Sequence, residues 1–232
     1  MTELSESHRL PHRRYRRSTH RLGYEAAKRT LDILVSLTAI LALTLLLAAL
    51  CLLTRWTSPG PALFRQERLG RGMRRFTVLK LRTMYYGASD QVHRECVASL
   101  ARGDRMPVAG PRGLLKLEAD SRITPTGAWL RRTSLDELPQ LFNVLKGEMT
   151  LVGPRPVLPW EAEIWPLTYP AYSRRFEVKP GMTGLWQVSG RGMLSVEESF
   201  NLEAEYVQRR SFGLDLLILI RTVPAMLRGG TA

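Results

Sequence analysis

One stretch of the sequence is almost entirely apolar. From Ile33 to Leu53, only Ser36, Thr38 and Thr44 interrupt the hydrophobic side chains. A helix rises about 1.5 Å per residue, so this stretch is long enough for the roughly 30 Å hydrocarbon core of a bilayer. A core helix of a soluble protein would keep a polar face, which makes that alternative the less favoured one. The stretch therefore predicts a membrane helix.

Basic residues flank this helix on both sides. Lys28 and Arg29 precede it, and a series of arginines follows it between residues 55 and 75. Basic flanks prefer the cytoplasmic side of a membrane, so a spanning helix would place one flank on the unfavourable side. A re-entrant helix, which enters the membrane and returns on the cytoplasmic face, avoids this cost.

The chain as a whole carries a formal net charge of +13 over 232 residues. Such a charge favours an anionic partner, which could be nucleic acid, an acidic membrane surface or a phosphorylated substrate. The two cysteines, Cys51 and Cys96, indicate no disulfide framework and favour a reducing compartment. Residues 1–27 are polar and arginine-rich, which predicts a disordered arm or a segment that contacts acidic lipid.

The remaining chain predicts a compact α+β domain over residues 57–227, between the membrane helix at 28–56 and a short tail at 228–232. Alternation over residues 76–84 predicts a strand with Lys80 and Arg82 on one face, which is either solvated or the basic lining of a phosphate site. Residues 179–191 predict a turn, a strand and another turn, whereas residues 85–118 show no firm periodicity and form a variable segment.

Two further segments suggest contact with the membrane surface. Residues 160–172 are rich in aromatic side chains, which fits either a membrane interface or ordinary packing. Residues 214–227 are apolar but are interrupted by Asp215, Arg221 and Pro224, so an interfacial amphipathic helix is favoured over a spanning one.

Two adjacent acids, Asp136 and Glu137, lie between an arginine pair at 131–132 and the turn Pro154-Arg155-Pro156. Near a helix N-terminus, partial positive charge favours a carboxylate and a bound phosphate together. The structural alternative for Glu137 is a capping box with Ser134, which the nearby proline at position 139 weakens. The acids are therefore candidates for phosphate chemistry.

Several blocks occur together and in order between Lys28 and Thr222. They are Lys28-Arg29-x-x-Asp32 with the apolar helix, Gln66-x-Arg68-x-Gly70, Lys80-x-Arg82-Thr83-Met84, Leu130 to Gln140, Asn143-Val144-Leu145-x-Gly147-x-Met149, Val152 to Pro156 and Lys179 to Arg191. In these blocks the chain resembles the bacterial sugar transferase family, the monotopic polyprenyl-phosphate phosphoglycosyltransferases. The resemblance implies an enzyme of the bacterial inner membrane whose catalytic domain lies on the cytoplasmic face.

The resemblance also implies a reaction and roles for individual residues. A sugar-1-phosphate would pass from a UDP-sugar to undecaprenyl phosphate with release of UMP, which initiates exopolysaccharide, capsule, O-antigen or other glycan assembly. Asp136 would be the nucleophile that forms a covalent phosphosugar intermediate, and Glu137 would hold Mg²⁺. The matching contacts to substrate phosphate are Arg131 and Arg155, with Lys80, Arg82, Gln187 and Arg191 as further candidates.

One departure concerns the membrane helix. The family's helix usually carries a Ser-Pro break near its middle, whereas the corresponding place here, Thr44-Leu45, has no proline.

Inner-membrane lipids and a homodimer are further expected partners, and nucleic acid is not expected. The competing interpretation is a membrane-tethered binding protein whose basic surface holds nucleic acid or acidic lipid without catalysis, and it leaves the acidic pair unexplained.

Overall fold

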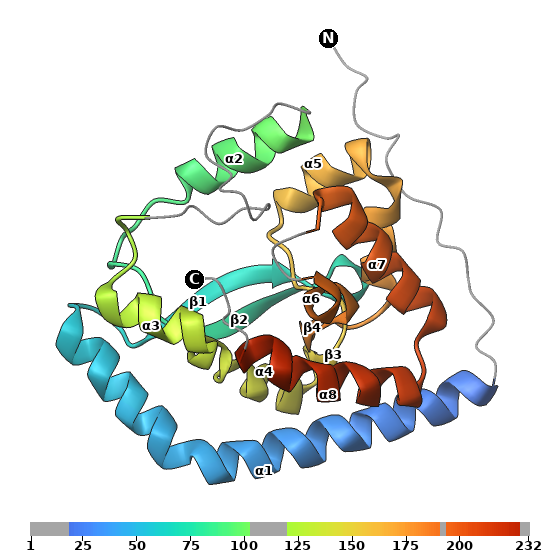
Figure 1. The fold of residues 1–232 in the computed structure, drawn as a ribbon, viewed down its shortest axis with the longest axis horizontal. Coiled ribbons are helices and arrows are strands. Elements are labelled where there is room, and N and C mark those ends of the chain that lie inside the picture. Colours follow the sequence, from blue (N-terminus) through green and yellow to red (C-terminus); the bar gives the residue numbers. More distant parts are fainter. Residues whose placement is uncertain (1–18, 103–119, 191–193, 228–232) are drawn as a thin grey trace, which may run out of the picture.

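A computed structural model describes residues 19–102, 120–190 and 194–227 (Figure 1). Helices surround two small sheets, which confirms the predicted α+β class. The elements are, in order, α1 (Thr19–Thr57), β1 (Leu63–Leu69), η1 (Arg71–Met73), β2 (Arg75–Leu81), α2 (Gln91–Ala101), α3 (Pro125–Thr133), η2 (Leu135–Glu137), α4 (Gln140–Lys146), β3 (Thr150–Val152), α5 (Glu161–Thr168), η3 (Pro170–Glu177), β4 (Gly181–Thr183), α6 (Leu185–Gly190), α7 (Val196–Arg209) and α8 (Phe212–Leu227).

Helix α1 contains the predicted membrane helix and begins at Thr19 rather than at residue 28. Its segment Leu22–Thr57 is long and apolar enough to cross a membrane, and only 11% of its most apolar stretch is buried inside the protein. A core helix of a soluble protein would be mostly buried. The exposed apolar surface therefore favours the membrane helix over the core-helix alternative.

Helix α1 changes direction partway along its length, although no proline interrupts it (Figure 1). The Thr44 hydroxyl donates a hydrogen bond to the Ile40 carbonyl at 2.7 Å. Bonds of this kind, from a hydroxyl to the carbonyl four residues earlier, often bend helices. Threonine thus supplies a local cause of bending in the region where the family usually has proline.

Polar side chains fasten the N-terminal part of α1 to the domain. Lys28 Nζ donates to the Asp215 carboxylate of α8 at 2.8 Å. The Asp32 carboxylate accepts hydrogen bonds from the Thr150 hydroxyl at 2.7 Å and from the Leu151 backbone N–H at 2.9 Å. These contacts hold α1 against β3 and α8, which runs beside it in Figure 1.

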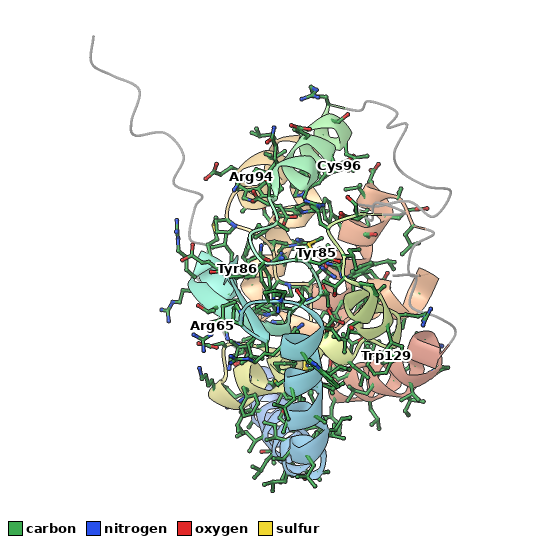
Figure 2. The ribbon with its side chains drawn as sticks, turned by 90° about the vertical axis from the view of Figure 1, so that its left-hand side faces the viewer. Arg65, Tyr85, Tyr86, Arg94, Cys96 and Trp129 are labelled. Atoms are coloured by element: carbon green, nitrogen blue, oxygen red, sulfur yellow. The ribbon has the colours of Figure 1, made fainter. Side chains whose placement is uncertain are left out.

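The strand predicted over residues 76–84 is confirmed as β2, which pairs antiparallel with β1, with Phe64 opposite Lys80 and Leu69 opposite Arg75. Strands β3 and β4 form a separate parallel pair. Residues 181–183 form the predicted strand, but residues 185–190 form helix α6 instead of continuing the strand or turn. Helix α2 lies within residues 85–118, the variable segment that shows no firm periodicity. It carries Arg94 and Cys96 and lies at the end of the molecule away from α1 (Figure 2).

The aromatic segment at 160–172 is packed inside the protein. Trp165 is 2% exposed and Tyr172 is 1% exposed, and the rings of both meet Phe200 of α7 edge to face. Ring contacts of this geometry stabilise a core beyond the burial of their area. Ordinary packing is therefore the correct alternative for these two rings, whereas contact of the rest of the segment with a membrane stays a prediction.

Helix α8 is the helix predicted over residues 214–227, with slightly earlier bounds. Its inner face buries Asp215 and Ile218, whereas its outer face exposes apolar side chains, among them Leu217 and Ile220. The helix is thus amphipathic, as predicted, and its contact with a membrane stays a prediction.

Candidate active site

Asp136 and Glu137 lie on η2, a short turn of helix between α3 and α4. Ser134 separates η2 from α3 and adopts the left-handed conformation, with φ of 57°. This conformation ends α3 and turns the chain so that Asp136 faces inward, where it is 8% exposed. A short helical turn after a left-handed residue therefore presents the two adjacent acids.

The capping box that was the alternative role for Glu137 with Ser134 does not form. The Ser134 hydroxyl caps no backbone N–H and has no hydrogen-bond partner among the described residues. A capping box does occur at the start of α7, where Ser195 accepts from the Glu198 N–H and the Glu198 carboxylate accepts from the Ser195 N–H. Glu137 is therefore not used to cap a helix through Ser134.

Lys80 of β2 reaches the acidic pair. Its ammonium group lies 2.8 Å from Glu137 Oε1. Burial raises the pKa of Asp136, and the negative charge of Glu137 raises it further, whereas Lys80 and Arg131 act in the opposite direction. Asp136 is thus a buried carboxylate whose ionised form depends on the cations around it.

The structure also brings Arg131 to Asp136, and Arg155 to Arg131. Arg131 Nε donates to the Thr83 hydroxyl at 2.8 Å, and burial lowers the pKa of Arg131 while the charges of Asp136 and Asp120 raise it. Arg155 is exposed, and its positive charge further lowers the pKa of Arg131. Arg131 therefore acts directly on the charge of Asp136, and Arg155 acts on Arg131.

Arg68 belongs to the same group but was not among the residues predicted from the sequence. Its guanidinium donates to the Gln66 side chain at 2.6 Å and to the Pro156 carbonyl at 3.3 Å. Burial lowers the pKa of Arg68 to about 10, and Arg155 contributes to the lowering, whereas Glu161 and Glu137 oppose it. The Gln66-x-Arg68 spacing, which puts both residues on one face of β1, could have suggested this role.

Of the other predicted contacts, Arg82 is used in the fold. Arg82 is 5% exposed, and its guanidinium donates to the Ser58 hydroxyl at 2.6 Å and the Ser58 carbonyl at 2.7 Å. These donors close the turn that follows α1 and are not directed at the acidic pair. Gln187 lies on α6 and donates to a backbone carbonyl of β4 at 3.3 Å, and Arg191 lies outside the described residues.

The donor set fits a magnesium ion that is shared with a substrate. In the part of the chain that the structure describes, no three His, Cys, Asp or Glu side chains gather into a ready metal site. Mg²⁺ is commonly bound by one or two carboxylates and completes its shell with water and substrate phosphates. The two neighbouring acids supply such carboxylates. That Glu137 binds Mg²⁺ stays a prediction, and this donor set is compatible with it.

Fold and site together define a class of protein: an α+β domain on an apolar anchor helix, with a buried aspartate among cations suited to phosphate chemistry. Residues 23–229 match the family model described as bacterial sugar transferase. The chain belongs to the bacterial sugar transferase family, and the sequence-based prediction of a phosphoglycosyltransferase is confirmed at this level.

Relatives in three bacteria are similar over most of this chain. A UDP-glucose:undecaprenyl-phosphate glucose-1-phosphate transferase of Caulobacter vibrioides is 41% identical over 89% of this chain and 72% of its own length. A UDP-galactose-lipid carrier transferase of Erwinia amylovora is 42% identical over 87% of this chain, but only 40% of its own length is covered. The exopolysaccharide production protein ExoY of Sinorhizobium fredii is 38% identical over 86% of this chain and 85% of its own length.

Proposed function

We propose that the protein transfers a sugar-1-phosphate from a UDP-sugar to undecaprenyl phosphate and releases UMP. The observation that carries this proposal is the buried Asp136 between Lys80 and Arg131, because a phosphate can approach a carboxylate only where cations offset the repulsion. The names of the Caulobacter and Erwinia relatives support a nucleotide-sugar donor and a lipid acceptor. The name of the Sinorhizobium relative supports a place in exopolysaccharide production.

The proposed reaction has two displacements at one phosphorus atom. The Asp136 carboxylate attacks the sugar-bearing phosphorus, and the bond from that phosphorus to the bridging oxygen breaks, so that UMP leaves with the electron pair. An oxygen of undecaprenyl phosphate then attacks the same phosphorus and displaces the carboxylate. Two displacements return Asp136 to its starting form, as expected for a covalent nucleophile.

The cations of the site have separate tasks in this scheme. Arg131 and Arg155 would bind phosphate oxygens, for which the planar guanidinium offers paired donors. Lys80 balances the charge of the acidic pair before substrate binds. Bound Mg²⁺, held by Glu137, would neutralise the developing charge on the leaving phosphate.

We also infer that α1 is re-entrant in the bacterial inner membrane and that the catalytic domain faces the cytoplasm. Lys28, near one end of α1, forms a salt bridge with Asp215. Ser58, just after the other end, accepts a hydrogen bond from Arg82. A straight membrane-spanning helix would place these two ends on opposite sides of the bilayer. The bend in Figure 1 and the basic flanks support an entry and return on one side.

The direct test is release of UMP by the full chain in detergent with Mg²⁺, undecaprenyl phosphate and a panel of UDP-sugars that includes glucose and galactose. We expect turnover with at least one donor, dependence on undecaprenyl phosphate, and loss of turnover after chelation of Mg²⁺. Glu137→Gln should raise the Mg²⁺ concentration needed for half-maximal activity. Failure of every donor to release UMP, combined with steeply salt-dependent DNA binding, would instead support the binding-protein interpretation.

A further inference from the structure

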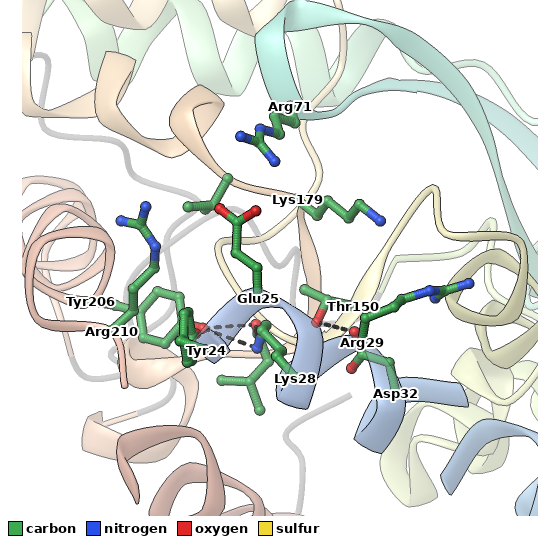
Figure 3. A pocket seen from close by; sticks show the side chains of 12 residues that line it. Tyr24, Glu25, Lys28, Arg29, Asp32, Arg71, Thr150, Lys179, Tyr206 and Arg210 are labelled. Carbon is green, nitrogen blue, oxygen red and sulfur yellow. Dashed lines mark hydrogen bonds between the residues drawn. The ribbon is translucent and has the colours of Figure 1, made fainter. Parts of the chain in front are cut away.

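A cavity of about 250 Å³ lies at the N-terminal end of α1, apart from the acidic pair (Figure 3). Arg71 of η1 lines it, whereas Lys80 lies toward the opposite end of the β1–β2 hairpin. The five steps along β2 from Arg75 to Lys80 extend about 16 Å, so the cavity residue Arg71 lies well away from Lys80 along the hairpin. Asp136 and Glu137 are not among the residues that line the cavity.

Positive side chains dominate the lining of this cavity. They are Arg29, Arg71, Lys179 and Arg210, in addition to Lys28. Figure 3 shows Glu25 projecting into the space between Lys179 and Arg210, with Arg71 nearby. The positive charge in the lining therefore exceeds what its carboxylates can offset.

The remaining charges of the lining already have fixed partners. Lys28 is paired with Asp215 at 2.8 Å, and the Asp32 carboxylate accepts from the hydroxyl of Thr150 at 2.7 Å. The Arg29 guanidinium donates to two carbonyls at the C-terminal end of α4, at 2.6 and 2.7 Å, which fixes its charge beside the cavity. These contacts hold the walls in place and leave the other cations to face the space.

The cations in the cavity act on one another. Burial lowers the pKa of Lys179, and the charges of Arg29 and Arg71 lower it further, whereas Asp32 and Glu25 oppose the lowering. Within the described residues, neither Arg71 nor Lys179 forms an ion pair. Like charges that outnumber the neighbouring acids are stabilised when an anion binds between them.

The cavity also lies at the depth of lipid headgroups, if the apolar part of α1 is in the membrane. Arg29 precedes Ile33, where the apolar stretch begins, by four residues, or about 6 Å along the helix. Basic pockets beside membrane helices are suited to anionic headgroups, since the phosphate remains in the polar layer while the acyl chains stay in the hydrocarbon.

We propose that this cavity binds a phosphate group at the membrane surface, carried by an anionic phospholipid headgroup or present as free inorganic phosphate. Arg71 and Lys179 are its principal contacts, with Arg29 and Arg210 contributing charge. A lipid bound here would join α1, η1 and the segment before β4, and would hold the domain at a fixed height on the bilayer. This site is separate from the proposed catalytic centre and does not depend on the sugar transferred.

The test compares two double variants of the full chain in neutral detergent. In Arg71→Gln with Lys179→Gln, both removed charges line the cavity; in the control, Arg74→Gln with Arg75→Gln, both are exposed and lie outside it. Native mass spectrometry measures the affinity for dioleoyl phosphatidylglycerol and for dioleoyl phosphatidylcholine. Titration calorimetry measures the affinity for inorganic phosphate.

We expect the wild type to prefer phosphatidylglycerol, and the cavity variant to lose about tenfold or more in affinity while the control changes less than about twofold. If inorganic phosphate alone shows this pattern, the site is confirmed with free phosphate as its ligand. Equal losses in both double variants, or no discrimination by the wild type, would overturn the proposal. Glu25→Gln should strengthen binding, which a variant that merely misfolds would not do.

Discussion

Two groups of buried charges in this protein are built in opposite ways. Around Lys28, each charge has close partners: Asp215 accepts from Lys28 at 2.8 Å and from the Tyr206 hydroxyl at 2.7 Å. Around Asp136, the neighbouring cations Lys80 and Arg131 act on its charge, while Lys80 makes its hydrogen bond to the adjacent Glu137. Saturated charges stabilise a fold, whereas a carboxylate whose cations are directed elsewhere remains available to a ligand.

Asp136→Asn should have the largest effect on activity. It tests the group of charges around Asp136, called the open group here because its carboxylate remains available to a ligand. UMP release should fall by about a thousandfold or more, since a covalent nucleophile has no substitute. Burial raises the pKa of Asp136 in the folded state, so the stability linked to its protonated form is lost as pH rises through that raised pKa. Asparagine stays neutral, so the melting temperature at pH 7.5 should be unchanged or higher. Undiminished UMP release would remove Asp136 from its proposed role.

Asp215→Asn tests the group of paired charges around Lys28. This variant should lower the stability of the fold, in contrast to Asp136→Asn. It leaves Lys28, whose side chain is 16% exposed, without its carboxylate, which should cost about 3 kcal/mol in the free energy of unfolding. Thermal unfolding in detergent measures this loss. The control is Asp90→Asn, which breaks an exposed pair with Arg94 and should cost less than about 0.5 kcal/mol. Equal stability of the two variants would contradict the comparison.

Lys80→Gln should move the activity of the open group along the pH scale. The positive charge of Lys80 lowers the pKa of Asp136, so its removal raises that pKa and a larger fraction of Asp136 is protonated at a given acidic pH. The acidic limb of the kcat/KM profile should therefore shift to higher pH. Lys146→Gln, at an exposed position of α4, is the control and should leave the limb in place. A shift to lower pH would refute the assigned sign.

The smallest expected effect is a difference in the free energy of unfolding between two serine-to-alanine variants. Ser195→Ala removes the real capping box of α7 and should cost about 1 kcal/mol in the free energy of unfolding. Ser134→Ala removes a hydroxyl that has no partner among the described residues, so its effect on that free energy should be within about 0.5 kcal/mol. Chemical denaturation in mixed micelles compares the pair. A larger cost at Ser134 would revive the capping interpretation.

Much of the fold could be predicted because local patterns depend on neighbours along the chain. The apolar stretch of α1 follows from a continuous run of residues, and the alternation of β2 and the amphipathic pattern of α8 follow from repeats of a few residues. Helix α6 was missed because glycines on either side of a short segment suggested a turn. The burial of Trp165 and Tyr172 was left open, since an aromatic side chain suits a core as well as an interface.

The candidate site could be predicted only in part. Asp136, Glu137, Arg131 and Arg155 lie in one stretch of sequence, and the structure brings this stretch together with Lys80 of β2. The donors of Arg82, two residues after Lys80, close the turn after α1 instead. Alternation along a strand assigned both side chains to one face, but it could not show which neighbour each would meet.

The sequence by itself determined the membrane helix, the α+β class, the family and the acidic pair, because these rest on composition and on motifs of adjacent residues. Only the tertiary structure decided that Lys80 pairs with Glu137 across 57 positions, that Arg68 joins the site and that cations line a cavity beside α1. The physical reason is that such meetings depend on the packing of distant elements, whose relative placement no local pattern contains.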